Sequence, residues 1–192
     1  MAIETEIKLA LESKGLSTED VTRRLIDLGF IEISPGTFED NLIFDSVKGS
    51  LARQGKLLRL RRYGDKVSMT FKKPGKGGKD YKVREEVETE VLDMDSSRMI
   101  LQGIGLSVVY RYQKYRAEFR KAGLLACLDN TPIGDFLELE GEPRDIDRYA
   151  LKLGFRKTDY VTVSYRQLHK QWAEETGKKW PRDMVFEKDG HD

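Results

Sequence analysis

Apolar and polar residues alternate along several short segments of the chain, which is the pattern of β-strands with two different faces. The alternation predicts seven strands, at residues 3–11, 56–63, 66–73, 81–91, 107–120, 123–130 and 135–141. Turn-forming sequences such as Tyr63-Gly64-Asp65-Lys66 and Arg120-Lys121-Ala122-Gly123 separate some of them. Because hairpins connect antiparallel neighbours, we expect a mostly antiparallel sheet.

Three other segments combine a helical spacing of apolar residues with an apolar-Gly-apolar end. These ends are Leu28-Gly29-Phe30, Ile104-Gly105-Leu106 and Leu153-Gly154-Phe155. A glycine just past the last turn suits the left-handed backbone that closes many helices. We therefore place helices at residues 17–28, 95–103 and 145–153, with Ser17 and Ser96 near the starts of the first two. A fourth helix follows Ser164 and ends near Glu175, and we expect the chain beyond Trp180 to fray.

Charged residues recur at every second position in five of the predicted strands, so they share one face of each strand. They are Glu4, Glu6 and Lys8; Arg59 and Arg61; Arg84, Glu86 and Glu88; Lys114 and Arg116; and Glu138 and Glu140. A solvated outer face explains this pattern in one strand, but not acidic pairs on some strands and basic pairs on others. We therefore expect an α+β fold: a closed antiparallel β-barrel with helices packed on the outside and charges lining its interior.

Charges of both signs inside a barrel need partners, because an unpaired buried charge is costly. The acidic pairs offer the oxygen ligands that Mg²⁺ or Mn²⁺ binds, and both ions readily bridge phosphates. Arginine and lysine offer hydrogen-bond donors to an extended polyanion. A metal ion together with a linear polyphosphate would satisfy both sets of charges, so the expected ligand is a small-molecule triphosphate.

Seven short motifs follow one another along the chain. They are Glu4-x-Glu6-x-Lys8, Phe44-Asp45, Leu58-Arg59-Leu60-Arg61-Arg62, Thr70-Phe71-Lys72, Val83-Arg84-Glu85-Glu86-Val87-Glu88, Leu128-Asp129 and Phe136-Leu137-Glu138-Leu139-Glu140. In this order they resemble the CYTH superfamily, also called triphosphate tunnel metalloenzymes. The resemblance spans about residues 3–166 and is closest to the branch of class IV adenylate cyclases and thiamine triphosphatases.

The resemblance implies roles for individual residues. The implied metal ligands are Glu4, Glu6, Asp129, Glu138 and Glu140. The implied substrate-binding residues are Lys8, Arg59, Arg61, Lys72, Arg84, Lys114 and Arg116, and the implied catalytic residues are Lys8, Arg59, Lys72 and Glu86. Two positions depart from the family. Asp45-Ser46 stands where Asp-Thr is common, and Val163 precedes Ser164-Tyr165 where some members have a basic residue that contacts phosphate.

We therefore predict a metal-dependent phosphohydrolase that acts on inorganic tripolyphosphate or on a nucleoside or thiamine triphosphate. Catalysis would be mainly electrostatic, because metal, arginine and lysine neutralise the charge that develops on the phosphates. One alternative is a class IV adenylate cyclase that converts ATP to cyclic AMP and pyrophosphate. A second alternative is a non-catalytic module that binds polyphosphate or nucleotides, although such a module does not need both acidic pairs.

Composition limits the compartment and the partners. The chain has 34 lysines and arginines against 33 aspartates and glutamates, and its formal net charge of +1 argues against binding to nucleic acid or to a membrane surface. Cys127 is the single cysteine, which excludes an intrachain disulfide and favours the cytoplasm. We expect one barrel domain at residues 1–175 and a polar tail at residues 176–192, and the oligomeric state stays open.

Three residues of types that often carry chemistry have simpler explanations here. His169 and His191 have no second histidine nearby, so we expect both at the surface. Cys127 lies in an apolar stretch, so we expect a buried and unreactive thiol.

Overall fold

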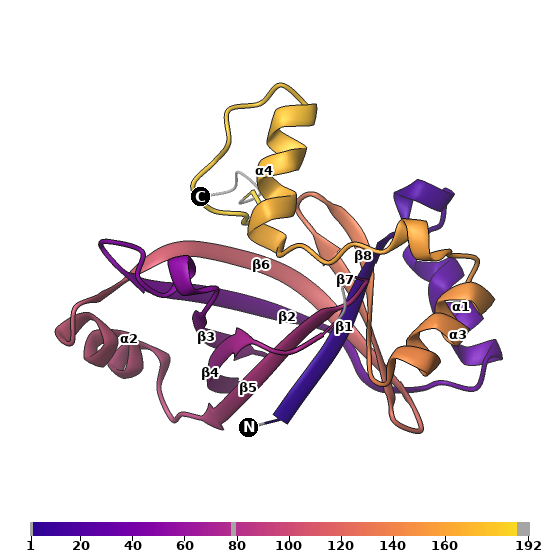
Figure 1. The fold of residues 1–192 in the computed structure, drawn as a ribbon, viewed down its shortest axis with the longest axis horizontal. Coiled ribbons are helices and arrows are strands. Elements are labelled where there is room, and N and C mark those ends of the chain that lie inside the picture. The colour runs from indigo at the N-terminus through magenta and orange to yellow at the C-terminus, as the bar shows by residue number, and fades with distance from the viewer. Residues whose placement is uncertain (1, 78–79, 188–192) are drawn as a thin grey trace.

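The computed structural model describes residues 2–77 and 80–187. Within these residues, eight antiparallel strands close into one barrel in the order β1-β5-β4-β3-β2-β6-β7-β8 (Figure 1). The strands are β1 (Ala2–Ala10), β2 (Ile31–Ser46), β3 (Leu57–Tyr63), β4 (Lys66–Pro74), β5 (Lys82–Glu90), β6 (Leu106–Lys121), β7 (Leu124–Thr131) and β8 (Gly134–Glu140). The prediction of a closed antiparallel barrel is confirmed.

Strand β2 is absent from the strands predicted by alternation. The register of its pairing with β6 shifts between Glu32 and Ser34 and again between Ser34 and Thr37. Such irregularities interrupt the two-residue period, so the sequence carries no clean alternation there. The omission matters for the site, because β2 places Glu39 and Asn41 in the barrel interior.

In the part of the chain that the structure describes, four α-helices lie outside the barrel (Figure 1). They are α1 (Thr18–Asp27), α2 (Met94–Gly103), α3 (Pro143–Lys152) and α4 (Tyr165–Glu175), with short 3-10 turns η1 (Glu12–Lys14), η2 (Ala52–Gln54) and η3 (Lys157–Asp159). Gly29, Gly105 and Gly154 follow the first three helices with φ of 81°, 88° and 98°, which confirms the predicted helix ends. The start of α2 differs from the prediction, because Asp93 is the N-cap and accepts a hydrogen bond from the Ser96 backbone N–H. No helix in the described residues is long and apolar enough to cross a membrane.

The strands turn apolar residues outward beneath the helices. Leu9 and Leu139 are fully buried in the cluster that packs against α1 and α3, and Leu60 is fully buried in the cluster under α2. Helix cover is incomplete, however. Ile3 on β1 and Val87 on β5 remain 74% and 50% exposed on the outer face.

The chain after α4 folds back onto the barrel, so the expectation that it frays beyond Trp180 is wrong for residues up to 187. Met184 is 1% exposed and forms a parallel bridge with Tyr112 on β6. The Phe186 ring lies 5.4 Å from that of Tyr115. These contacts follow from the pairing of β6, because β7 pairs only with its second half and leaves backbone groups of its first half to other partners.

Candidate functional site

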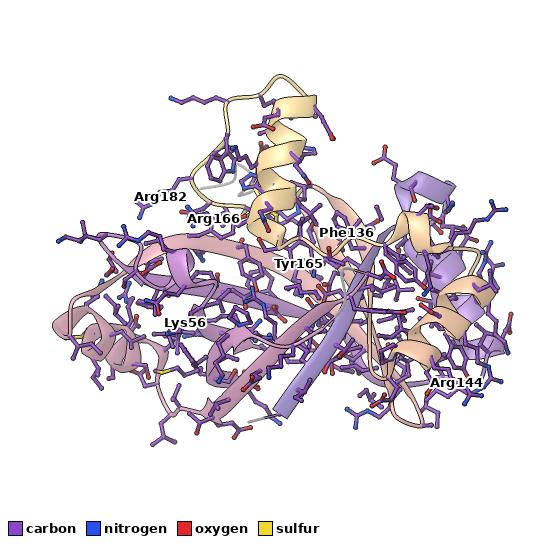
Figure 2. The ribbon with its side chains drawn as sticks, in the orientation of Figure 1. Lys56, Phe136, Arg144, Tyr165, Arg166 and Arg182 are labelled. Atoms are coloured by element: carbon purple, nitrogen blue, oxygen red, sulfur yellow. The ribbon has the colours of Figure 1, made fainter. Side chains whose placement is uncertain are left out.

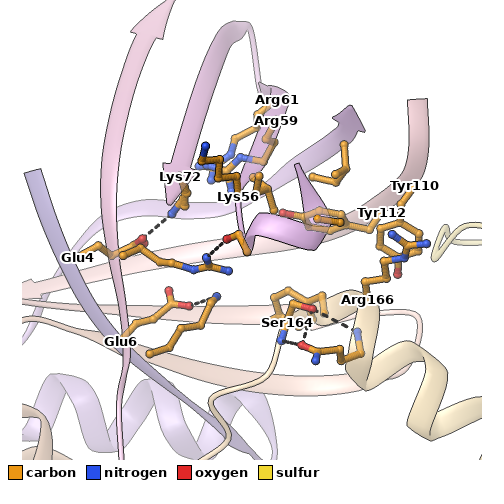
Figure 3. Close-up of a pocket in the computed structure, with 18 of the residues that line it drawn as sticks. Glu4, Glu6, Lys56, Arg59, Arg61, Lys72, Tyr110, Tyr112, Ser164 and Arg166 are labelled. Atoms are coloured by element: carbon orange, nitrogen blue, oxygen red, sulfur yellow. Dashed lines mark hydrogen bonds and ion pairs between the residues drawn. The ribbon is translucent and has the colours of Figure 1, made fainter. Parts of the chain in front are cut away.

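A cavity of about 360 Å³ lies inside the barrel (Figure 3). Its charged lining residues are Glu4, Glu6, Lys8, Asp45, Lys56, Arg59, Arg61, Lys72, Lys82, Arg84, Lys114, Arg116, Glu138, Glu140 and Arg166. Strand register explains why they meet, because residues directly opposite each other on neighbouring strands share a face. Of the predicted site residues, all except Glu86 and Asp129 line this cavity.

An acidic cluster of Glu4, Glu6 and Glu140 lies where β1 meets β8, and Glu6 is the register partner of Glu140. Lys72 Nζ lies 2.6 Å from a Glu4 carboxylate oxygen, and Lys8 Nζ lies 3.2 Å from one of Glu6. Glu140 forms no ion pair with any residue that the structure describes. Burial, then the charges of Glu4 and Glu6, raise the pKa of Glu140 to about 7. Among residues 2–77 and 80–187, the acidic cluster thus holds a carboxyl group that no lysine or arginine pairs with directly.

Asp129 and Glu138 act as counter-ions for basic residues deep in the barrel. Asp129 is fully buried and accepts hydrogen bonds from Arg116 Nε at 2.6 Å, Lys114 Nζ at 2.9 Å and the Tyr165 hydroxyl at 2.6 Å. Glu138 also pairs with Arg116. Burial raises the pKa of Glu138, but the surrounding basic side chains outweigh burial and hold that pKa well below its usual range. Glu138 therefore stays charged, and the two side chains together fix the position of Arg116.

Arg59 and Arg61 form an arginine pair at alternate positions of β3, facing the cavity (Figure 3). Arg59 is 7% exposed, and its Nη2 donates to the Thr70 hydroxyl at 3.2 Å. Within residues 2–77 and 80–187, the Nε atoms of both arginines are buried without an acceptor. A buried donor without an acceptor costs about 1–3 kcal/mol. The arginine pair is therefore suited to an anionic ligand that accepts these hydrogen bonds.

Lys72 connects the acidic cluster to a carboxylate outside the cavity lining. Its Nζ lies 2.6 Å from Glu4 and 2.7 Å from Glu86, so Glu86 reaches the site through this lysine. Lys82 lines the cavity as well and pairs with Glu6 at 2.5 Å. The sequence-based prediction omits Lys82, although the alternation that includes Arg84 points to it two residues earlier.

Sequence reasoning missed Glu39 and Asn41, which lie in the barrel interior and support the site without lining the cavity. Both are fully buried, and Asn41 Nδ2 donates to Glu39 at 2.9 Å. Glu39 also lies 3.7 Å from Arg61 and 3.6 Å from Lys114. Burial raises the pKa of Glu39, but these two cations outweigh burial and keep its pKa below the usual range. Glu39 therefore stays charged and acts as a counter-ion beneath the arginine pair.

The first turn of α4 reaches the cavity (Figures 2 and 3). Ser164 caps this helix and accepts a hydrogen bond from the Gln167 backbone N–H, and the Tyr165 side chain lines the cavity. Arg166 also lines the cavity, whereas Val163 does not. A basic residue thus reaches the cavity from this segment, three positions after the valine.

The surface position predicted for His169 is wrong, because the side chain is only 2% exposed. Helix α4 turns it toward β6, where its Nδ1 lies 3.1 Å from the Tyr110 hydroxyl and 3.3 Å from Trp180 Nε1. His191 lies outside the described residues. Cys127 is buried as predicted, and burial raises the pKa of its thiol above the usual value.

Known proteins share this architecture. The CYTH domain family matches residues 2–162, and no curated protein sequence matches the chain. A candidate adenylate cyclase from Vibrio parahaemolyticus superposes with a TM-score of 0.76 at 18% identity, over 88% of this chain and 98% of that chain. PH1012 from Pyrococcus horikoshii OT3 superposes with a TM-score of 0.69 at 24% identity, over 84% of this chain and 96% of that chain. HpAC1 from Hippeastrum is reported to have a dominant triphosphatase activity. It superposes with a TM-score of 0.60 at 21% identity, over 94% of this chain and 99% of that chain. At such identities these structural likenesses establish the fold alone.

Proposed function

Because the chain belongs to the CYTH domain family, we propose that it is a metal-dependent phosphohydrolase that acts on a triphosphate held inside the barrel. One observation carries this proposal. A single cavity brings the acidic cluster of Glu4, Glu6 and Glu140 together with the arginine pair, Arg59 and Arg61. The first group suits a divalent cation, and the second suits phosphate oxygens.

The charge of the cavity supports a polyanionic ligand. Among the described residues, ten basic and five acidic side chains line it, although the formal net charge of the whole chain is only +1. A local excess of positive charge in a nearly neutral protein attracts an anion to that place. Arg59 and Arg61 add planar guanidinium groups, which bind phosphate through paired hydrogen bonds.

The acidic cluster fits a divalent cation that binds together with the substrate. No three acidic, histidine or cysteine side chains of the described residues form a ready-made metal cage. Mg²⁺ does not need one, because it usually binds through one or two carboxylates, substrate phosphates and water. Glu140, with its pKa raised to about 7 by burial and by Glu4 and Glu6, is the group that such a cation would stabilise most. Mg²⁺ or Mn²⁺ would therefore be held by Glu4, Glu6 and Glu140, with Glu138 beside them.

When bound, the metal ion supplies positive charge to the phosphate oxygens. The protein's own side chains orient the phosphates and neutralise the charge that develops as a bond breaks. Burial lowers the pKa of Lys8, but its glutamate partners outweigh burial and hold it above the usual value, so Lys8 acts as a cation. Glu86 keeps Lys72 in place. Asp129 is left out of the metal set, because protein donors already occupy its oxygens.

Product analysis with Mg²⁺ or Mn²⁺ tests the proposal. Tripolyphosphate, ATP and thiamine triphosphate are supplied separately, and we expect orthophosphate from at least one of them, with release stopped by a chelator. Cyclic AMP and pyrophosphate from ATP would instead establish the cyclase alternative. Binding without any product would establish the non-catalytic alternative.

Arg59→Lys should lower kcat/KM by about 5- to 150-fold, which corresponds to about 1–3 kcal/mol. Lysine keeps the charge but loses the planar fork that binds two oxygens at once. The loss should be similar for tripolyphosphate and for ATP, because the arginine contacts phosphate only. Initial rates at limiting substrate measure it, with Arg62→Lys on the exposed side of β3 as the matched control. Normal turnover by Arg59→Lys would exclude Arg59 as a phosphate ligand.

A further inference from the structure

The lysines that line the cavity differ in their partners. A carboxylate oxygen lies within 3.2 Å of the Nζ atom in Lys8, Lys72, Lys82 and Lys114. Lys56 lines the same cavity, but among residues 2–77 and 80–187 no carboxylate oxygen lies within 4.0 Å of its Nζ. Lys56 therefore brings a positive charge to the cavity that no described carboxylate neutralises by direct contact.

The ammonium group of Lys56 has a neutral partner instead. Its Nζ donates to the side-chain oxygen of Gln54 at 2.6 Å. Gln54 is exposed, and its own amide group donates to the Ser50 carbonyl oxygen. An ammonium group has three donors, so this contact leaves two of them for a ligand. Hydrogen bonds from an ammonium group to a charged phosphate oxygen are stronger than those to a neutral amide. An anion in the cavity can thus bind Lys56 without breaking an ion pair.

Lys56 lies at the edge of the arginine pair (Figures 2 and 3). It directly precedes β3, three positions before Arg59, and the next residue, Leu57, is the register partner of Lys72 on β4. Neighbouring strands are about 4.8 Å apart. Figure 3 shows Lys56, Arg59 and Lys72 on one side of the cavity. A phosphate chain that contacts Arg59 and Lys72 would therefore pass beside Lys56.

The connection between β2 and β3 fixes the backbone of Lys56. Asp45, at the end of β2, accepts hydrogen bonds from the backbone N–H groups of Leu51 and Ala52, both at 2.9 Å. The Lys56 backbone N–H donates to the Leu51 carbonyl oxygen at 2.9 Å. These bonds tie the turn η2 to β2 on one side and to the start of β3 on the other.

Gly55 allows this connection to approach β4 and β5 closely just before Lys56. Its φ is 65°, and a Cβ atom there would lie 2.8 Å from Pro74 Cγ. Glycine suits both the positive φ and the close contact, because it has no side chain. The Gly55 carbonyl oxygen accepts a hydrogen bond from Arg84 on β5. Arg84 thus uses one donor to hold the backbone beside Lys56, in addition to lining the cavity.

We propose that Lys56 is a further substrate-binding residue, whose ammonium group binds the phosphate chain of the triphosphate from the β2–β3 connection. The inference rests on the proposed function. Lys56 is half-buried, and the partial loss of water around a charged group is costly unless an anion replaces that water. The alternating charges of the strands do not indicate this residue, because it lies before the first position of β3. The site then includes a loop as well as barrel strands.

Calorimetric titration of Lys56→Gln and Lys56→Arg with tripolyphosphate and Mg²⁺ tests this proposal. Glutamine removes the charge, so we expect Kd to rise about tenfold, the low end of the effect of losing a hydrogen bond to a charged group. Arginine keeps the charge and should restore most of the affinity. Lys48→Gln is the matched control, because Lys48 is exposed on the same connection and does not line the cavity.

Three results would overturn the proposal: an unchanged Kd in Lys56→Gln, a loss of the same size in Lys48→Gln, or a loss in Lys56→Arg as large as that in Lys56→Gln. Absence of tripolyphosphate binding to the wild type would reject it as well. Product analysis is separate from these titrations. If the wild type binds tripolyphosphate but releases no orthophosphate from any triphosphate, the proposed function fails. A higher Kd confined to Lys56→Gln would then still support Lys56 as a phosphate ligand.

Discussion

Glu140→Gln is expected to reduce phosphate release by about 100- to 1000-fold, the range found when one preorganised electrostatic contact is removed from an active site. Glutamine keeps the shape of the side chain but cannot supply the negative charge that a divalent cation needs. The loss should persist at saturating Mg²⁺. Glu12→Gln, an exposed change outside the barrel interior, serves as the control. Normal metal-dependent activity in Glu140→Gln would show that Glu140 is not a metal ligand.

The same substitution should stabilise the metal-free protein at neutral pH. Burial, then Glu4 and Glu6, raise the pKa of Glu140 from 4.5 to about 7. Between these values the folded protein keeps a proton that the unfolded chain releases, so the free energy of unfolding falls as pH rises from about 4.5 to about 7. At about 1.4 kcal/mol per pH unit, the loss is on the order of 3 kcal/mol. Glu140→Gln avoids this loss of stability, because glutamine does not titrate.

Urea unfolding in the presence of a chelator, near pH 5 and near pH 8, measures this difference. The free energy of unfolding of the variant should clearly exceed that of the wild type near pH 8, and only slightly exceed it near pH 5. Adding Mg²⁺ should then stabilise the wild type more than the variant, because a ligand that binds only the folded state stabilises it. A difference that does not change with pH would show that Glu140 is not crowded by like charges in the folded protein.

Asp129→Asn should lower the free energy of unfolding by about 3–5 kcal/mol, the cost of removing one partner from a buried ion pair. Asp129 is fully buried and binds Arg116, Lys114 and Tyr165. Asparagine has no charge, so two buried cations lose a close counter-ion. Urea unfolding measures the effect, and Asp27→Asn at the exposed end of α1 should change it by no more than about 0.5 kcal/mol. A loss as small as that of the control would contradict the assigned role.

The closed barrel could be predicted because its evidence is local. Glu4, Glu6 and Lys8 alternate with apolar residues, and a two-residue period fixes which side chains share a face. The same reasoning fails for β2, because register shifts near Ser34 and Thr37 break the period. The strand order has no such local signal, since it depends on which distant segments pair.

Some residues of the candidate site could likewise be predicted from the sequence, and others could not. Residues on regular strands, such as Arg59 and Glu138, could be located from alternation and motif resemblance. Glu39 could not, because its strand was not predicted. Arg166 and His169 belong to a helix that returns to the barrel only in the folded protein, and neither its spacing nor its composition indicates that return. Tertiary packing alone brings Arg166 to the cavity and His169 against Tyr110 on β6.

The partial pairing of β6 has a consequence for self-association. The barrel is closed around its circumference, but β7 reaches only the second half of β6, so the first half behaves as an edge strand. Unpaired edge strands are templates for pairing with another molecule, and natural proteins protect them by covering or twisting them. The bridge from Met184 to Tyr112 and the contact of Phe186 with Tyr115 provide such cover. The last described residues thus cover an edge that would otherwise be open to pairing with another molecule.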